Sequence, residues 1–531
     1  MKIRRQKHWG WGYEDERPSA ESVRATAAGL ASHLGFELGD IEEPVELDAL
    51  ALAAPRVRPP ASLTSICAND DHARASHSLG KSYADVVSGF RGRFEHPPDF
   101  VARPRGEGEL EAVLEWCSQQ RVAAIPYGGG TSVVGGVTPN VAGTYNGAVS
   151  IDLHALDRVL EVDPVSRAAR IQAGAAGPVL EAQLGEHGLT LRHFPQSFEL
   201  STLGGWIATR AAGHFATVLT HIEDFVESVR AVTPGGPWES RRLPGSGAGV
   251  SPDRLLAGSE GTLGIITEAW VRVQPRPEHR RSQGVLFDTF ARGAECVRTI
   301  SQSGLYPANC RLIDAEEARV TMAGDGSRVL LVLGFESTDH PVDSSMQRAL
   351  ELCVEHGGAP AQSARGDGGD AVGSWRRAFL GAPYVRDVLV AMGVLSETFE
   401  TAITWERFPA FEEQVRAAAQ QAVREACGGQ GLVTARFTHV YPDGPAVYFT
   451  VPAPARRGEE LEQWGEIKSA VSDAVIAAGG TITHHHAVGR DHRPWYEKQR
   501  PDPFAQALRA AKGAVDPSAI LNPGVLFDPA P

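Results

Sequence analysis

The chain has 531 residues, enough for two or three domains, and its 42% hydrophobic and 22% charged residues are typical of a globular protein. The net charge of −14 argues against nucleic acid as a partner, because a polyanion would be repelled. Six cysteines without a CxxC pair favour free thiols in a reducing compartment over disulfides or structural zinc. No apolar run reaches the roughly 18 residues of a membrane span. We therefore expect a cytoplasmic protein, with room for a peripheral contact at the inner face of a membrane.

The first part of the chain predicts an arm followed by a strand–helix–strand unit. Residues 1–95 are polar, with a proline-rich joint at 54–60, and indicate helices and loops. Residues 100–102 and 122–125 are apolar and predict strands. Between them, residues 107–120 carry apolar side chains at i, i+3, i+4 and i+7, which predicts an amphipathic helix. These side chains are Leu110, Val113, Leu114 and Cys117.

A glycine-rich turn follows the second of these strands. It is formed by Pro126, Tyr127, Gly128, Gly129, Gly130, Thr131 and Ser132. Consecutive glycines expose backbone N–H groups without Cβ atoms in the way, and such a nest suits a diphosphate. The two hydroxyls add donors. The spacing matches neither the P-loop nor the dinucleotide-binding fingerprint, and taken alone the turn could be purely structural.

The following 150 residues predict a meander of strands with two more loops of small residues. Residues 159–163 and 170–174 are expected to pair as strands, and Pro178 suits the start of a helix. The two loops are 196–213 and 258–268, rich in glycine, serine and threonine. Either loop could be a simple turn, but three such loops within one span could together wrap one long phosphate-bearing cofactor. The alternation is typical of an α+β domain.

A second α+β unit is expected after residues 273–277. Residues 327–335 and 446–450 predict central strands, and 411–426 a helix between them. The last stretch, 504–531, predicts a helix and a proline-rich tail.

Two features of the second unit could carry chemistry. His484, His485 and His486 are expected in a turn after an apolar strand end at 481–483. Consecutive side chains cannot all face one ion, so we predict no metal site from the triplet. Tyr441 precedes a predicted strand, where a tyrosine is ordinarily a packing residue. To abstract a proton near neutrality, its pKa would have to be lowered by neighbours such as the histidines.

In this order, these stretches resemble the vanillyl-alcohol oxidase superfamily of flavoenzymes, and within it the alkyldihydroxyacetonephosphate synthases, which make the ether bond of ether lipids. The resemblance covers nearly the whole chain. It is carried by residues 4–13, 126–132, 193–206, 222–224, 258–264, 311–314 and 484–489.

The resemblance implies an α+β fold with a two-part, PCMH-type FAD-binding domain and an α+β substrate (cap) domain. The FAD-binding domain would span residues 96–277 and the cap 278–495. An N-terminal helical arm would occupy residues 1–95, and a C-terminal segment, 496–531, would return to the FAD-binding domain. A homodimer is expected by analogy.

The resemblance also implies the residues that hold FAD. Besides the glycine turn, they are Gln196, Ser197, Ser201, Thr202, Thr209, Arg210, Ala212, Gly258, Ser259, Glu260, Gly261, Gly264 and Ile265. Covalent attachment in this superfamily needs a histidine or cysteine, often in the glycine loop. Because Tyr127 and Thr131 stand there instead, we expect FAD to be bound non-covalently.

For catalysis, the resemblance implies that Tyr441 is the acid/base, assisted by the three histidines. Arg386 would bind the substrate phosphate, with Arg311 and His193 nearby. Guanidinium recognises phosphate bidentately. The alternative is that Arg386 forms an ion pair with Asp387 or Glu397.

The chain departs from the synthase pattern at several positions. Residues 213–221 replace a lysine-containing segment, and Phe194 and Gln196 replace acidic residues. His485 stands where related D-2-hydroxy acid dehydrogenases carry a glutamate. The expected activity is exchange of the acyl group of acyl-dihydroxyacetone phosphate for a long-chain alcohol through a flavin N5 adduct. The alternatives are an FAD-dependent oxidase or dehydrogenase of a D-2-hydroxy acid or alcohol, and an FAD-binding module without turnover.

Overall fold

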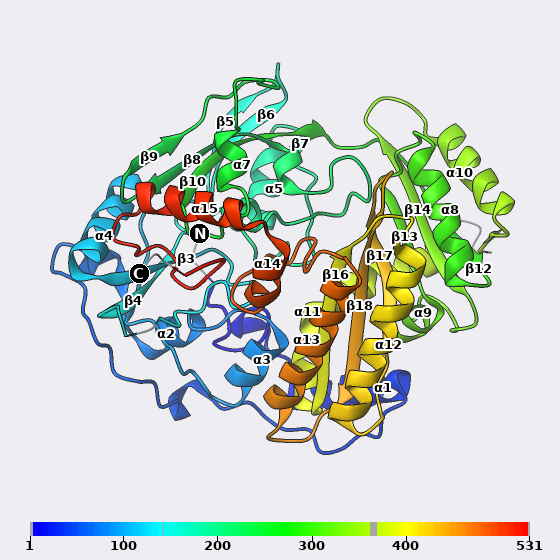
Figure 1. Ribbon diagram of the computed structural model, residues 1–531, viewed down its shortest axis with the longest axis horizontal. Helices are drawn as coiled ribbons and strands as arrows, with labels where there is room; N and C mark the ends of the chain where they lie inside the picture. The colour runs from blue at the N-terminus through cyan, green and yellow to red at the C-terminus, as the bar shows by residue number, and fades with distance from the viewer. Residues whose placement is uncertain (1–3, 142, 362–368, 529–531) are drawn as a thin grey trace.

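The computed structural model describes residues 4–141, 143–361 and 369–528, which form two units side by side (Figure 1). Within these residues, sheets of four, five and two strands belong to one unit and a sheet of seven strands to the other. The chain crosses between the units where β11 (Gln274–Pro275) ends and β12 (His279–Phe287) begins. The predicted domain boundary at residue 277 falls in this crossing.

The first sheet has the order β1-β2-β4-β3 and contains the predicted strand–helix–strand unit. Its strands are β1 (Cys67–Ala68), β2 (Phe100–Ala102), β4 (Gly147–Asp152) and β3 (Val122–Tyr127). Helix α4 (Glu107–Gln120) joins β2 to β3, and its four predicted core side chains are all buried, as expected. β3 runs parallel to β4 and is almost wholly buried, so its end fixes where the glycine turn begins.

The second sheet is antiparallel, with the order β5-β6-β10-β8-β9. Its strands are β5 (Val159–Asp163), β6 (Ala168–Gln172), β10 (Ile265–Arg272), β8 (Val226–Thr233) and β9 (Gly236–Glu239). The predicted pairing of β5 with β6 is confirmed. Short elements complete this unit: α5 (Gly177–Gly185), β7 (Leu189–Thr190), α6 (Leu203–Thr209), η4 (Ile222–Asp224) and α7 (Pro252–Leu256).

The large sheet of the second unit has the order β15-β12-β14-β13-β17-β18-β16. Besides β12, its strands are β13 (Asn309–Ile313), β14 (Val329–Ser337), β15 (Ala359–Pro360), β16 (Val394–Ala402), β17 (Thr434–Val440) and β18 (Pro445–Pro454). One continuous core joins it to α8 (Phe290–Gln302), α10 (Asp343–Glu355), α12 (Phe408–Cys427) and α13 (Glu460–Ala477). The remaining helices here are α9 (Ala315–Val320) and α11 (Gly369–Ala391).

Two expectations for secondary structure are wrong. Residues 481–483 are not a strand end: they form an irregular connection after α13, because the large sheet already ends at β16. The N-terminal arm is not only helices and loops, because β1 joins the first sheet through β2. The rest of the arm carries η1 (Glu14–Glu16), α1 (Ala20–Leu34), η2 (Leu47–Ala49), η3 (Thr64–Ile66), α2 (Asp71–Ser76) and α3 (Tyr83–Phe90).

The two ends of the chain tie the units together. At the N-terminus, the buried Asp387 carboxylate on α11 accepts the Trp11 backbone N–H (2.9 Å) and lies 3.4 Å from Lys7 Nζ. At the C-terminus, α14 (Arg493–Gln499) and α15 (Asp502–Val515) lead back to the first unit (red in Figure 1). There the Ala124 N–H donates to the Ile520 carbonyl (2.8 Å), beside the strand that carries the glycine turn. None of the helices in the described ranges is long and apolar enough to span a bilayer.

Candidate active site

The glycine turn is pressed against the second small-residue loop. A Cβ at Gly128 would lie 2.3 Å from Thr202 Oγ1, and a Cβ at Gly129 only 1.9 Å from the Leu200 carbonyl oxygen. Gly130 has a φ of +66°, a conformation that L-residues rarely adopt. Glycine is therefore required by close approach at two positions and by backbone conformation at the third.

The backbone donors of this turn match the predicted diphosphate nest. Among the described residues, the N–H groups of residues 128–132 meet no hydrogen-bond acceptor. Buried backbone donors are rarely left without a partner, so a row of them favours an anionic ligand. The Tyr127 hydroxyl donates to the Ser76 carbonyl (2.9 Å) and packs against Gly130, where a Cβ would lie 2.0 Å from it. The turn fits the phosphates of a dinucleotide such as FAD.

The third loop meets the first two. A Cβ at Gly261 would lie 2.6 Å from Pro126 Cγ, and the Glu260 N–H donates to the Ala208 carbonyl at the end of α6. The side chains of Ser197, Ser201 and Trp206 are bonded to one another, Trp206 Nε1 lying 2.6 Å from Ser201 Oγ. The structure thus brings the three loops together. Their contact with FAD stays a prediction.

Several of the predicted cofactor residues have structural partners. Arg210 pairs with Glu223 (2.8 Å) and is half exposed, and Thr209 Oγ1 donates to the Gly205 carbonyl (2.8 Å). Ile265 is buried in the apolar core. Gln196 Nε2 reaches the Phe379 carbonyl of α11 (2.9 Å), so this side chain spans the two units.

The histidine triplet forms a half-buried turn between the units, held by a buried carboxylate that the sequence patterns did not reveal. Glu400 on β16 accepts the backbone N–H groups of His484 (2.7 Å), His485 (3.0 Å) and His486 (2.8 Å). Burial acts to raise the pKa of Glu400, but the attraction of His485 and the other histidines outweighs it and holds that pKa well below its usual range. The same strand carries a second buried glutamate, Glu397, so nothing local in the sequence singled out Glu400.

A second buried carboxylate holds the residues that follow. Glu260, in the third loop, accepts the N–H groups of Val488 (2.9 Å) and Gly489 (2.9 Å). Burial raises the pKa of Glu260 to about 7. The predicted cofactor loop and the histidine turn are therefore joined directly.

Tyr441 and His484 form the central pair of the site. Tyr441 Oη lies 2.7 Å from His484 Nε2 and donates to Thr220 Oγ1 at 3.0 Å. Burial raises the pKa of Tyr441, and burial, then the neighbouring His485, lowers the pKa of His484 well below its usual value. The expected lowering of the tyrosine pKa by the histidines is wrong, because neutral imidazoles supply no positive charge. The pair is a neutral phenol against a neutral imidazole.

His439 on β17, His221 and Thr220 also belong to this cluster, and the sequence analysis did not select them. The ring of His439 stacks on that of His484, with centroids 5.0 Å apart, and its Nε2 donates to the Gly213 carbonyl (3.0 Å). In the described ranges, His439, His484 and His485 are the one set of side chains whose ligand atoms lie close enough to share a metal ion, within 4.8 Å of one another. His484 Nδ1 and His485 Nδ1 are 2.9 Å apart, the length of a hydrogen bond, so this arrangement suits proton sharing.

The predicted substrate residues lie around this cluster. His193 is buried against Trp206 (5.1 Å), neither ring nitrogen has a partner within the described chain, and burial lowers its pKa to about 3. Arg311 is buried and donates to the His214 carbonyl (3.3 Å); burial, then the charge of Arg436, lowers its pKa to about 9.

Arg386 does not form the alternative ion pair considered from the sequence. Its guanidinium donates to the Lys81 carbonyl, whereas Asp387 is bonded to the arm and Glu397 pairs with Lys468 (3.1 Å). Within the described residues, no carboxylate pairs with Arg386.

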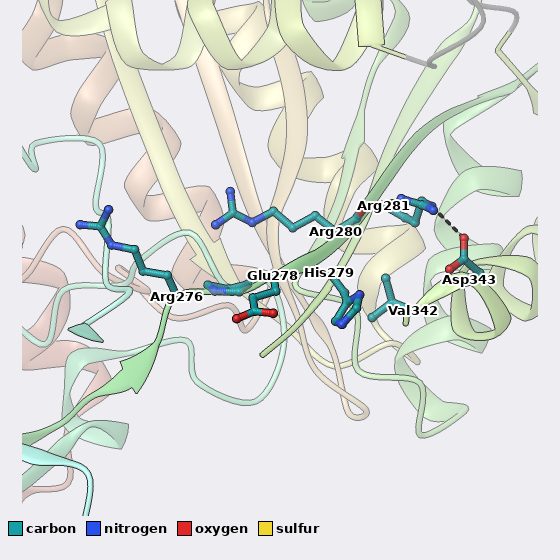
Figure 2. Close-up of a pocket in the computed structure, with 8 residues that line it drawn as sticks. Arg276, Glu278, His279, Arg280, Arg281, Val342 and Asp343 are labelled. Atoms are coloured by element: carbon teal, nitrogen blue, oxygen red, sulfur yellow. Dashed lines mark hydrogen bonds and ion pairs between the residues drawn. The ribbon is translucent and has the colours of Figure 1, made fainter. Parts of the chain in front are cut away.

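A cavity of about 480 Å³ lies at the crossing between the units (Figure 2). It is lined by Arg276, Glu278, His279, Arg280, Arg281 and Asp343, among others. Arg281 Nε is 2.8 Å from an Asp343 oxygen. None of the predicted site residues lines this cavity.

Comparison with known proteins agrees with this geometry. Residues 98–240 match the model of the FAD binding domain family, and residues 276–526 match that of the C-terminal domain of FAD linked oxidases. Alkyldihydroxyacetonephosphate synthase of Dictyostelium discoideum is 31% identical over 488 residues, covering 86% of this chain and 78% of that protein. The Caenorhabditis elegans synthase is 30% identical (87% and 81%), and glycolate oxidase subunit GlcD of Bacillus subtilis 28% (82% and 90%).

Solved structures show the same relationship. An alkyldihydroxyacetonephosphate synthase superposes with a TM-score of 0.81 at 27% identity, covering 97% of this chain and 98% of that one. p-Cresol methylhydroxylase, 14% identical, shares the fold with a TM-score of 0.69. The fold and site thus define an FAD-dependent enzyme of the PCMH type. Within that class, the chain belongs to the alkyldihydroxyacetonephosphate synthase family.

The close approach at Gly129 makes a prediction for cofactor binding. Gly129→Ala would force the turn away from the Leu200 carbonyl, and we expect FAD content per chain to fall below a tenth of wild type. Flavin absorbance of the purified protein measures this. Gly108→Ala, at a helical glycine with open space around it, is the control and should keep full occupancy. A Gly129→Ala protein that retains stoichiometric FAD would contradict the assignment of this turn.

Proposed function

We propose that the protein replaces the acyl group of acyl-dihydroxyacetone phosphate with a long-chain alcohol, the activity named for its synthase relatives. The observation that carries the proposal is the half-buried Tyr441–His484 pair beside the three loops, in a chain that matches a synthase over 86% of its length. The exchange breaks the C1–O bond of the ester, forms a C1–O bond to the alcohol and releases a fatty acid. The alcohol loses one proton and the fatty acid gains one, so no net oxidation occurs.

In this reaction Tyr441 moves protons. A phenol in a buried site holds its proton near neutrality, so it can donate to the departing carboxylate and then accept a proton in return. FAD, when bound, supplies the electrophilic ring on which the exchange depends. The glycine turn would hold its phosphates through the N–H row, and Arg386, without a carboxylate partner in the described chain, would hold the substrate phosphate.

The state of the cofactor and the location of the protein stay proposals. We propose non-covalent FAD, supported by Tyr127 and Thr131 in the glycine turn, so acid precipitation should leave flavin in the supernatant. A cytoplasmic location is supported by the unbridged state of the six cysteines. A homodimer and a peripheral membrane contact stay predictions by analogy.

The alternative is oxidation of a D-2-hydroxy acid or alcohol. It is favoured by the match of residues 276–526 to FAD linked oxidases and by the likeness to GlcD. Oxidation would need an electron acceptor, whereas acyl exchange needs none, so the two activities can be separated.

An anaerobic assay separates them. With acyl-dihydroxyacetone phosphate and hexadecanol, we expect equimolar ether product and free fatty acid, measured by mass spectrometry, without reduction of an added dye. D-Lactate and D-2-hydroxyglutarate form the comparison arm. Dye reduction by a hydroxy acid, with no ether product in the first arm, would establish the alternative instead.

Removing the phenol hydroxyl tests its role. We expect Tyr441→Phe to lower kcat by roughly 10²–10⁴-fold, the range for a general acid–base group, with FAD content unchanged. Tyr306→Phe, at a side chain 59% exposed, is the matched control and should behave as wild type. Turnover of Tyr441→Phe within twofold of wild type would remove Tyr441 from the mechanism.

A further inference from the structure

Hydrogen bonds and one ion-pair contact around Tyr441 form a continuous chain with an acceptor at each end. At one end, His485 Nδ1 lies 3.2 Å from the Glu400 carboxylate and 2.9 Å from His484 Nδ1. His484 Nε2 contacts Tyr441, which contacts Thr220. The chain continues to His221, whose Nε2 meets the backbone carbonyl of His484 at 2.9 Å. At each link of this chain, the atom that donates the hydrogen can be worked out from the two ends, because carboxylate and carbonyl oxygens can only accept.

Starting from Glu400, the hydrogen positions require that His484 donates to Tyr441. His485 Nδ1 faces a carboxylate, so it must carry a hydrogen. That hydrogen also faces His484 Nδ1, which must then be bare. Because burial keeps His484 neutral, its one hydrogen sits on Nε2 and points at Tyr441 Oη, 2.7 Å away.

Starting from the other end gives the same answer. His221 Nε2 faces a carbonyl and must carry a hydrogen, and burial keeps this ring neutral too, so its Nδ1 is bare. Thr220 Oγ1, 3.3 Å away, therefore donates to His221 and accepts from Tyr441. The Tyr441 oxygen is then left to accept from His484. Reasoning from either end therefore gives the same result: the Tyr441 oxygen accepts a hydrogen bond from His484 Nε2–H.

We propose that Glu400 is a positioning residue that, through His485, fixes the His484 tautomer whose Nε2–H donates to Tyr441 Oη. The inference rests on the proposed function and adds to it a group that touches neither substrate nor cofactor. When Tyr441 gives its proton to the departing carboxylate, the resulting phenolate keeps the His484 hydrogen bond, which is stronger to a charged oxygen. Without the carboxylate, either tautomer of His484 becomes allowed, and in the wrong one a bare Nε2 would face the phenolate.

The competing role for Glu400 is purely structural, to hold the backbone of the histidine turn as a brace. The same carboxylate accepts the N–H groups of His484, His485 and His486. Two substitutions separate the roles. Glu400→Gln keeps the length and one acceptor oxygen but loses the charge and can donate to His485. Glu400→Asp keeps an acceptor-only carboxylate but is one methylene shorter. If Glu400 acts by fixing the His484 tautomer, Glu400→Asp should be more active than Glu400→Gln. If it acts only by holding the backbone of the turn, the order should be reversed.

We expect Glu400→Gln to lower kcat by roughly 100-fold with KM within about twofold and FAD content unchanged. Glu400→Asp should recover at least tenfold of that loss. Glu397→Gln is the matched control: it removes a buried carboxylate from the same strand, β16, at a position paired with Lys468 instead of the histidine turn. It can lower the melting temperature but should keep kcat within about threefold of wild type.

The outcomes are distinct. Wild type without ether synthesis would overturn the proposed function, and this inference with it. An active wild type in which Gln equals or exceeds Asp would overturn this inference alone. If Glu400→Gln does not fold, Thr483→Ala takes its place, because it removes a hydroxyl bonded to both Glu400 and the His486 N–H but leaves the charge. Its kcat should stay within about threefold of wild type, whereas a loss of tenfold or more would show that Glu400 acts only by holding the backbone of the turn.

Discussion

Two buried carboxylates hold one irregular turn, and the site depends on this arrangement. Residues 484–489 belong to no helix or strand, so their buried N–H groups need acceptors from elsewhere. Glu400 supplies them from the large sheet and Glu260 from the third loop of the first unit. The turn is therefore hydrogen-bonded to both units at once. These bonds fix where the histidines of the cap lie relative to the predicted FAD site.

The electrostatics of the cluster follow from burial. A group of imidazoles in a dry site cannot all be charged, because each positive ring disfavours the next and burial disfavours every one. His221, His439 and His484, whose pKa values are lowered by burial, are therefore neutral. In a neutral imidazole one nitrogen donates a hydrogen bond and the other accepts one. One carboxylate among them is then enough to orient the network. The same burial keeps the phenol of Tyr441 protonated, as the proposed mechanism requires of a group that first donates a proton.

Sequence patterns predicted what is local and missed what is assembled across the chain. The amphipathic helix around Leu110 and Val113 and the hairpin of β5 and β6 follow from short-range periodicity and turn residues, and both are confirmed. The partners of Tyr441 could not be found this way, since Thr220 lies 221 residues away and His484 lies 43. Glu400 was missed for the same reason: it contacts the histidine turn 84 residues later, and nothing local marks a glutamate in a strand as a buried acceptor. The expectation of a lowered Tyr441 pKa was wrong because it assumed positively charged histidines, whereas burial lowers the pKa of the neighbouring His484.

The segment in which the chain departs from its family pattern, residues 213–221, supplies two of the polar side chains around Tyr441. Residues 213–221 lack the lysine expected there, yet they supply Thr220 and His221, the end of the hydrogen-bond chain on Tyr441. Cations nearby are otherwise engaged: Arg192 with Glu336, and Arg210 with Glu223. Arg386 contacts only a carbonyl among the described residues, and a guanidinium without a carboxylate is the stronger ligand for phosphate. Under the proposed function, this segment contributes Thr220 and His221 to the hydrogen bonds of Tyr441, and Arg386 is the residue proposed to bind the substrate phosphate.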